Sequence, residues 1–129
     1  MKTPLVLCVD DDIGIREFYG RLLSREGYDV ISAGTGPQAL DLVQSAKSPV
    51  DAAILDYELP GMNGFELAVR LKQNDPGLPI LMISGCLPQL EEMLPFVDAA
   101  MSKGVSVRHI LEGVDLLVAS RRERRLGSA

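Results

Sequence analysis

The segment that most constrains the fold is Ala52–Asp56, a run of four apolar residues that ends on a carboxylate. A short apolar run bounded by turn residues is typical of a strand that is buried in a sheet. A second such run, Leu5–Val9, ends directly before three consecutive acids, Asp10, Asp11 and Asp12. In open α/β sheets, the C-terminal ends of the strands line the crevice in which ligands bind. As parallel neighbours, the two runs would therefore form one acidic pocket.

Carboxylates that crowd together repel one another unless a cation lies between them. Hard oxygen ligands of this kind suit Mg²⁺, which keeps several waters and shares its coordination shell with phosphate. We therefore expect Asp10, Asp11 and Asp56 to form a divalent-metal site beside a carboxylate that accepts phosphate. Taken alone, the acidic triplet is explained equally well as a helix N-terminus, and we assign Asp12 to the N-cap.

Apolar periodicity and turn signals predict strands that alternate with helices. The first helix has an apolar face and ends at the cap residue Gly27; its face consists of Ile15, Phe18, Tyr19, Leu22 and Leu23. A strand is expected at residues 28–33, and Pro37 suits the first position of the next helix. Asn63 and Glu66 predict a capping box at the start of a third helix.

The last third of the chain is less regular. An apolar strand is predicted at residues 80–84, and the stretch that ends at Pro95 allows only a short helix. The strand at residues 99–102 is the weakest, because alanine is a poor strand former. A regular apolar face predicts a final helix that begins at Val107.

This alternation predicts an α/β fold, a doubly wound five-stranded parallel sheet with helices on both faces. The near-continuous apolar strands agree, since such strands are buried on both sides. At 129 residues we expect one domain with a proper core. Four candidate chemical positions then fall at strand C-terminal ends: Asp10 with Asp11, Asp56, Ser84 and Lys103.

Composition narrows the classes of protein. The net charge of −5 argues against a general nucleic-acid surface, and no apolar run reaches the length of a membrane span. Cys8 and Cys86 form no metal-ligand pattern, so we expect two free thiols in a cytoplasmic protein.

These positions together resemble the receiver domain of bacterial two-component response regulators, over nearly the whole chain. The family's paired metal-binding acids match Asp10 and Asp11, and its phosphorylated aspartate matches Asp56. The resemblance implies that the backbone carbonyl of Glu58 supplies another metal oxygen. It also implies a flavodoxin-like strand order, 2-1-3-4-5.

The family's hydroxyl residue matches Ser84, and its lysine matches Lys103. Both would contact the phosphoryl oxygens, where charge is spread during transfer. The resemblance implies that a sensor histidine kinase or a histidine phosphotransfer protein donates the group to Asp56 in a Mg²⁺-dependent reaction. The single histidine, His109, falls on the final helix, away from the pocket.

As a receiver, the chain is expected not to be an enzyme, because it would catalyse only its own phosphoryl transfer and dephosphorylation. An unknown downstream protein is its expected partner, with no direct nucleic acid and no membrane. We expect the receiver domain at residues 1–121 and a basic tail at residues 122–129, with no output domain. The arginines there are explained as cations at a helix C-terminus.

The chain departs from the family near Lys103. Receiver domains usually carry Tyr or Phe three residues before this lysine and proline after it, where this chain has Ala100 and Gly104. One alternative is therefore a degenerate receiver that acts as a phosphorylation-independent interaction module. Another is a phosphatase of the haloacid-dehalogenase type, in which Asp10 would be the nucleophile.

Overall fold

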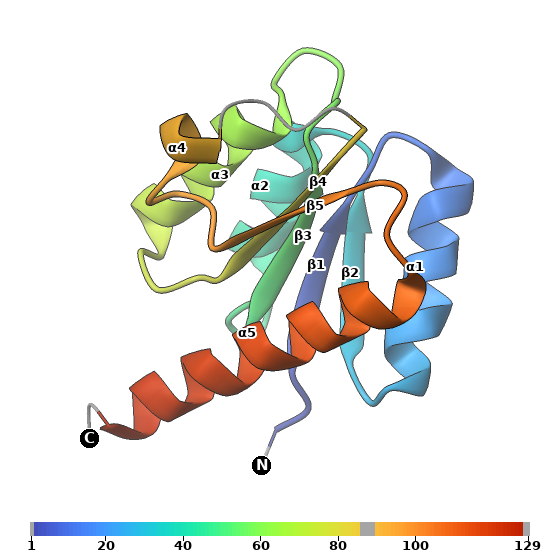
Figure 1. Ribbon diagram of the computed structural model, residues 1–129. Helices are drawn as coiled ribbons and strands as arrows, with labels where there is room; N and C mark the ends of the chain where they lie inside the picture. The colour runs from blue at the N-terminus through green and yellow to red at the C-terminus, as the bar shows by residue number, and fades with distance from the viewer. Residues whose placement is uncertain (1, 86–89, 128–129) are drawn as a thin grey trace.

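A computed structural model of the protein describes residues 2–85 and 90–127 (Figure 1). Strands and helices alternate along these residues. The strands are β1 (Leu5–Val9), β2 (Asp29–Ala33), β3 (Ala52–Asp56), β4 (Ile80–Ser84) and β5 (Ala99–Ser102). The helices are α1 (Ile13–Arg25), α2 (Gly36–Ser45), α3 (Gly64–Asn74), α4 (Leu90–Met93) and α5 (Val107–Gly127).

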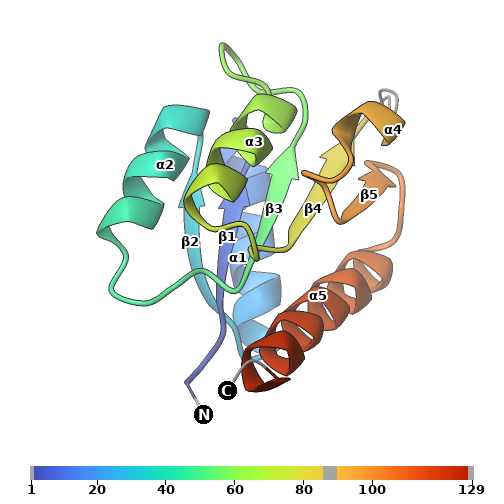
Figure 2. The same ribbon diagram turned by 90° about the vertical axis from the view of Figure 1, so that its left-hand side faces the viewer.

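Within the described residues the strands form one parallel sheet in the order β2-β1-β3-β4-β5. Helices α1 and α5 lie on one face, and α2, α3 and α4 lie on the other (Figures 1 and 2). This confirms the predicted doubly wound fold and its strand order. Because β1 pairs with β3 in register, with Val9 opposite Leu55, the acids that follow both strands emerge at the same edge.

Each face of the sheet has its own apolar core. Leu7, Leu55 and Met82 point toward α2, α3 and α4, while their strand neighbours point toward α1 and α5. The side chains of β3 and β4 are buried along both strands, as the continuous apolar runs predicted. The strands that end at the site are therefore held in place by apolar side chains packed on both faces of the sheet.

Three helix ends follow from local sequence. Asp12 is the N-cap of α1 and accepts from the N–H groups of Gly14 and Ile15, which confirms its predicted role. Asn63 and Glu66 make the predicted capping box at the start of α3. Helix α2 begins one residue earlier than predicted, at Gly36, so Pro37 takes its second position.

The predicted apolar face of α1 is only partly buried. Leu23 is fully buried, but Phe18 is 50% exposed and Ile15 is 37% exposed. The reason is position along the helix: these two residues border a cavity beside Asp10 instead of packing into the core. Gly27 has a φ of +93°, which confirms the predicted helix end.

Residues 122–127, expected as a basic tail with its arginines at a helix C-terminus, continue α5. Arg125 pairs with the buried Asp51 at 2.7 Å, and Arg122 donates to the backbone carbonyl of Lys2 at 2.6 Å. The end of the helix is thus held by acceptors in other parts of the chain, which the sequence of the helix alone does not show. Among the described residues, none of the helices combines the length and the hydrophobicity that a membrane span requires.

Gly64 fixes the turn between β3 and α3. Its N–H donates to the Tyr57 carbonyl at 2.9 Å, and a Cβ atom placed on it would lie 2.4 Å from the carbonyl oxygen of Asp56. A side chain cannot fit against a backbone atom at that distance. Glycine is therefore required here by close approach, directly beneath the candidate site.

We expect Gly64→Ala to lower the free energy of unfolding by about 2 kcal/mol or more, because the turn must move to admit the methyl group. Gly20→Ala is the matched control. A Cβ atom at Gly20, in the middle of α1, meets nothing within 4 Å. That substitution should raise stability by about 0.5–1 kcal/mol. Urea denaturation measures both, and equal effects would contradict the assigned role of Gly64.

Candidate functional site

Three carboxylates meet where β1 and β3 end. Oxygens of Asp10, Asp11 and Asp56 all lie within 4.8 Å of one another. Asp10 and Asp56 are buried, at 8% and 3% exposure, whereas Asp11 is exposed. The structure thus brings together the three acids that the sequence predicted as neighbours, and it leaves their open side toward solvent at Asp11.

Backbone hydrogen bonds hold the two buried acids. The N–H of Glu58 donates to Asp56 Oδ1 at 3.0 Å, and the N–H of Asp12 donates to Asp10 Oδ1 at 2.9 Å. Arg16 donates to the backbone carbonyl of Asp10 at 2.7 Å. Each carboxylate therefore keeps one oxygen fixed by the chain that follows it.

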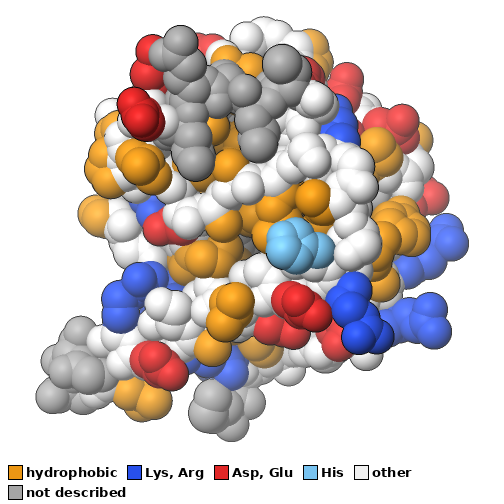
Figure 3. Space-filling model, viewed as in Figure 1, with side chains coloured by type: hydrophobic (Ala, Val, Ile, Leu, Met, Phe, Trp, Pro, Cys, Tyr) orange, Lys and Arg blue, Asp and Glu red, His pale blue; other side chains and the backbone are white. Residues whose placement is uncertain are grey.

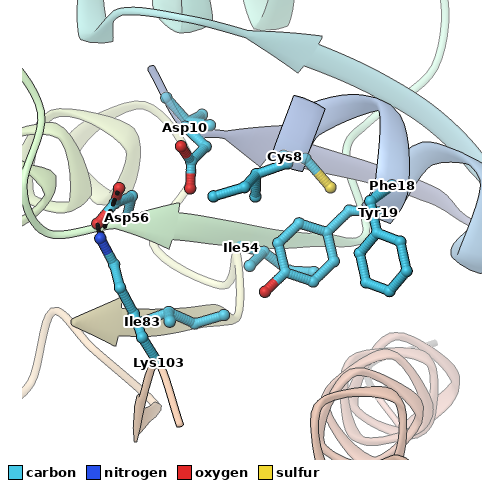
Figure 4. Close-up of a pocket in the computed structure, with 10 residues that line it drawn as sticks. Cys8, Asp10, Phe18, Tyr19, Ile54, Asp56, Ile83 and Lys103 are labelled. Atoms are coloured by element: carbon cyan, nitrogen blue, oxygen red, sulfur yellow. Dashed lines mark hydrogen bonds and ion pairs between the residues drawn. The ribbon is translucent and has the colours of Figure 1, made fainter. Parts of the chain in front are cut away.

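Lys103 follows β5 and reaches across the strand ends to Asp56 (Figure 4). Its Nζ lies 3.3 Å from each of the two Asp56 oxygens. The Lys103 N–H donates to the Ser84 carbonyl at 3.0 Å, which sets the position of the lysine beside β4. Two residues that lie 47 positions apart in the sequence are thus in direct contact at the strand ends.

The side chain of Glu58 is the feature that the sequence analysis missed. Its Oε1 accepts from the Ser84 hydroxyl at 2.8 Å and from the Gly85 N–H at 3.2 Å, and its Oε2 lies 3.2 Å from Lys103 Nζ. Only the backbone carbonyl of Glu58 was expected to take part. The Asp56-x-Glu58 spacing was the available signal, since a side chain two residues beyond the strand end can fold back over it.

Burial and neighbouring acids disfavour the charged forms of the two buried aspartates. Burial, the Glu58 side chain and the charge of Asp10 raise the pKa of Asp56 to about 6, against the N–H of Glu58 and the Lys103 charge. Burial also raises the pKa of Asp10, with a smaller contribution from the charge of Asp11. A cation placed between the two carboxylates would favour their charged forms.

Glu58 and Lys103 shift the opposite way. Partial burial acts to raise the pKa of Glu58, but hydrogen bonds with Ser84, Asp56 and Lys103 outweigh it and lower this pKa to about 2. Burial acts to lower the pKa of Lys103, but its bonds to Glu58 and Asp56 raise it. Glu58 is therefore an anion and Lys103 a cation at neutral pH.

An apolar cavity of about 160 Å³ adjoins the acids (Figure 4). Phe18 and Tyr19 of α1 line it, together with Cys8. Cys8 is a free, buried thiol, as predicted, and burial raises its pKa to about 12, so it is unreactive. Cys86, the other predicted free thiol, lies outside the described residues.

The single histidine is not part of the site. His109 lies on α5 and is exposed, and Figure 3 shows it in pale blue on the surface. The pocket-lining residues Asp10, Asp56 and Lys103 come instead from the ends of β1, β3 and β5.

Residues 6–111 match the family model of the response regulator receiver domain. The chain belongs to this family. The receiver is 35% identical over 94 residues to sporulation initiation phosphotransferase F of Bacillus subtilis, a match that covers 71% of this chain and 74% of that protein. It is 31% identical over 104 residues to the transcriptional regulatory protein GlrR of Escherichia coli, covering 81% of this chain but 22% of that protein.

Several of these relatives are longer proteins. Response regulator MprA of Mycolicibacterium vanbaalenii is 40% identical over 79 residues, which are 61% of this chain and 33% of that regulator. The receiver thus spans about a third or less of the length of the curated transcriptional regulators that it matches, and about three-quarters of the Bacillus protein.

Solved structures show the same fold. The CheY-like receiver domain protein of Methanospirillum hungatei superposes with a TM-score of 0.85 at 27% identity, covering 95% of this chain and 99% of the other. Response regulator TrrA of Thermotoga maritima, solved in complex with Mg²⁺ and BeF, gives 0.81 at 28% identity, covering 89% and 99%. The receiver fold of this chain is therefore established by sequence and by structure.

Ala100 and Gly104, the two positions at which the chain departs from the family, lie on either side of Lys103. Ala100 lies in β5, partly buried against the core shared with α3 and α4. Gly104 follows Lys103, and a Cβ atom placed there meets nothing within 4 Å. The space beside Gly104 is thus open, and no aromatic ring stands at position 100.

The raised pKa of Asp56 predicts a pH-dependent stability in the absence of divalent metal. The native state keeps this proton to about pH 6, whereas the unfolded chain releases it near 3.8. This contribution to stability is fully present below pH 3.8 and is lost as the pH rises through about 6. Asp56→Asn lacks it, so the variant should gain about 1–2 kcal/mol relative to wild type between pH 4 and 7.

Urea denaturation in a chelator, repeated across this pH range, measures that difference. Asp41→Asn, which removes an exposed carboxylate on α2, is the control for a general charge effect. A difference between Asp56→Asn and wild type that stays constant with pH would contradict the shifted pKa.

Proposed function

We propose that this receiver domain accepts a phosphoryl group on Asp56 as a step in two-component signal transduction. Receiver domains are phosphorylated by histidine kinases. For this chain, the donor would be a phosphohistidine on a sensor kinase or a histidine phosphotransfer protein. The observation that carries the proposal is the Lys103 ammonium, 3.3 Å from both oxygens of Asp56 at an edge where three carboxylates meet.

The reaction forms one bond and breaks one. An Asp56 oxygen attacks phosphorus as the bond from phosphorus to the donor's imidazole nitrogen breaks, and the nitrogen keeps the electron pair. The product is an acyl phosphate on Asp56 and a free imidazole, protonated by solvent. In dephosphorylation, a water oxygen attacks phosphorus, the bond from phosphorus to the Asp56 oxygen breaks, and inorganic phosphate leaves. We propose no further enzymatic activity.

Asp10, Asp11 and Asp56, with the backbone carbonyl of Glu58, would hold Mg²⁺. A cluster of carboxylate oxygens within 4.8 Å fits a small, hard dication. When bound, the cation neutralises charge that develops on the phosphoryl oxygens. The Mg²⁺–BeF complex of the Thermotoga maritima relative supports this assignment by analogy.

The protein's own groups complete the charge compensation. Lys103 is a compact point charge that suits a phosphoryl oxygen, and Ser84 presents a hydroxyl from the end of β4. Ser84 is fully buried, and in this structure its hydroxyl donates to Glu58 Oε1 at 2.8 Å. These two side chains would orient the group and stabilise its charge.

The alternatives fit the geometry less well. A phosphatase with Asp10 as nucleophile would direct Lys103 to Asp10, but the Lys103 ammonium contacts Asp56 at 3.3 Å and Glu58 at 3.2 Å. A degenerate receiver would have no need to gather the acids and Lys103 at one edge.

We further propose a cytoplasmic location, since a free thiol such as Cys8 is typical of a reducing compartment. The downstream protein partner is expected to bind by contacts outside the acidic pocket.

Acetyl phosphate and Mg²⁺ should label the wild-type protein on Asp56, and Asp56→Asn should not be labelled. Asp11→Asn should slow labelling by about tenfold or more, because it removes a metal ligand. Asp12→Asn is the matched control, since Asp12 only caps α1. Mass spectrometry of the trapped acyl phosphate gives both rate and position. Labelling of Asp56→Asn at the wild-type rate, with the phosphate on Asp10, would support the phosphatase reading instead.

A further inference from the structure

The side chain of Glu58 takes up the hydrogen-bond donors beside Asp56. One of its oxygens accepts from the Ser84 hydroxyl at 2.8 Å and from the Gly85 N–H at 3.2 Å; the other lies 3.2 Å from the Lys103 ammonium. A hydroxyl, a backbone amide and an ammonium group that converge in this way form a site for an oxyanion. In this structure the oxyanion is the Glu58 carboxylate.

A phosphoryl group on Asp56 would need the same donors. It carries charge on three oxygens, and Lys103 and Ser84 are the groups placed to meet them. The Ser84 hydroxyl has one proton to donate, so it cannot serve Glu58 and a phosphoryl oxygen at once. The new charge would also repel the Glu58 carboxylate directly.

We propose that the Glu58 carboxylate is a built-in competitor of the phosphoryl group. While Asp56 is unmodified, Glu58 occupies the donors of Ser84, Gly85 and Lys103, and it leaves them when Asp56 accepts phosphate. The inference rests on the proposed function of Asp56. Its consequence is that Glu58 slows phosphoryl uptake and weakens the binding of phosphoryl mimics.

Glu58 is held by these donors and not by packing. Its side chain is 44% exposed, so rotation into solvent meets little resistance. Its backbone is fixed separately, because its N–H donates to Asp56 Oδ1 at 3.0 Å. The side chain can therefore leave while the loop after β3 keeps its path.

A simple surface ion pair does not account for the arrangement. The pair between Glu58 and Lys103 is partly exposed and by itself contributes little. Such a pair would not bring the donors of Ser84 and Gly85 onto the second oxygen. All three donors point at one carboxylate, which is the geometry of a filled anion site.

Two substitutions separate competition from charge. Glu58→Ala removes the carboxylate and frees the donors. Glu58→Asp keeps the negative charge, but it is one methylene shorter and loses the 2.8 Å contact with Ser84. Asp12→Asn is the control for net charge, because that carboxylate accepts from Gly14 and Ile15 and touches none of the donors.

The measurement is a titration of the whole chain with beryllofluoride at saturating Mg²⁺, followed by ¹⁹F NMR and by the Gly85 amide resonance. Glu58→Ala and Glu58→Asp should both bind beryllofluoride about three- to tenfold more tightly than wild type. Labelling by acetyl phosphate should accelerate by a similar factor. Asp12→Asn should stay within about twofold of wild type.

The outcomes are distinct. Wild-type affinity in both Glu58 variants, or weaker binding in both, would overturn the competition. Tighter binding in Glu58→Ala alone, with Glu58→Asp unchanged, would assign the effect to charge and also overturn it. If wild type and all variants fail to bind beryllofluoride, the proposed function of Asp56 fails and the role of Glu58 fails with it. Binding by wild type therefore tells the two failures apart.

Discussion

The site depends on three carboxylates that the sheet holds together although they repel one another. Asp10, Asp11 and Asp56 lie within 4.8 Å of one another, and the Lys103 ammonium touches Asp56. The parallel pairing of β1 with β3 makes this crowding unavoidable, because both strands end at the same edge. The apolar cores on the two faces of the sheet supply the rigidity that holds the charges there. A cation and a phosphoryl group are the partners that such an arrangement fits.

Much of this could be predicted from sequence because it follows from local rules. Apolar runs marked the strands, Asp12 and the Asn63–Glu66 pair marked helix starts, and parallel strands bring their C-terminal ends together. The acidic cluster follows from that topology, which also places Lys103 at the same edge of the sheet. The family resemblance then supplied the strand order and the roles of the residues.

What the sequence did not reveal depends on contacts between distant elements. The Glu58 side chain takes its position from Ser84, at the end of β4, and from Lys103, directly after β5. Near the end of α5, Arg125 pairs with the buried Asp51, a partner that the sequence of the helix alone does not show. Phe18 has helical spacing but faces a cavity, because periodicity gives a face and not what covers it. Tertiary partners decide each of these features.

The most direct test is the structure of the whole chain with Mg²⁺ and beryllofluoride bound. We predict beryllium on an oxygen of Asp56, fluorine atoms at about 3 Å from the Ser84 hydroxyl and the Lys103 ammonium, and the Glu58 carboxylate turned into solvent. Beryllium on Asp10 would contradict the assignment of Asp56 as acceptor. A Glu58 carboxylate that still accepts from Ser84 and Lys103, beside an occupied Asp56, would contradict the competition between them.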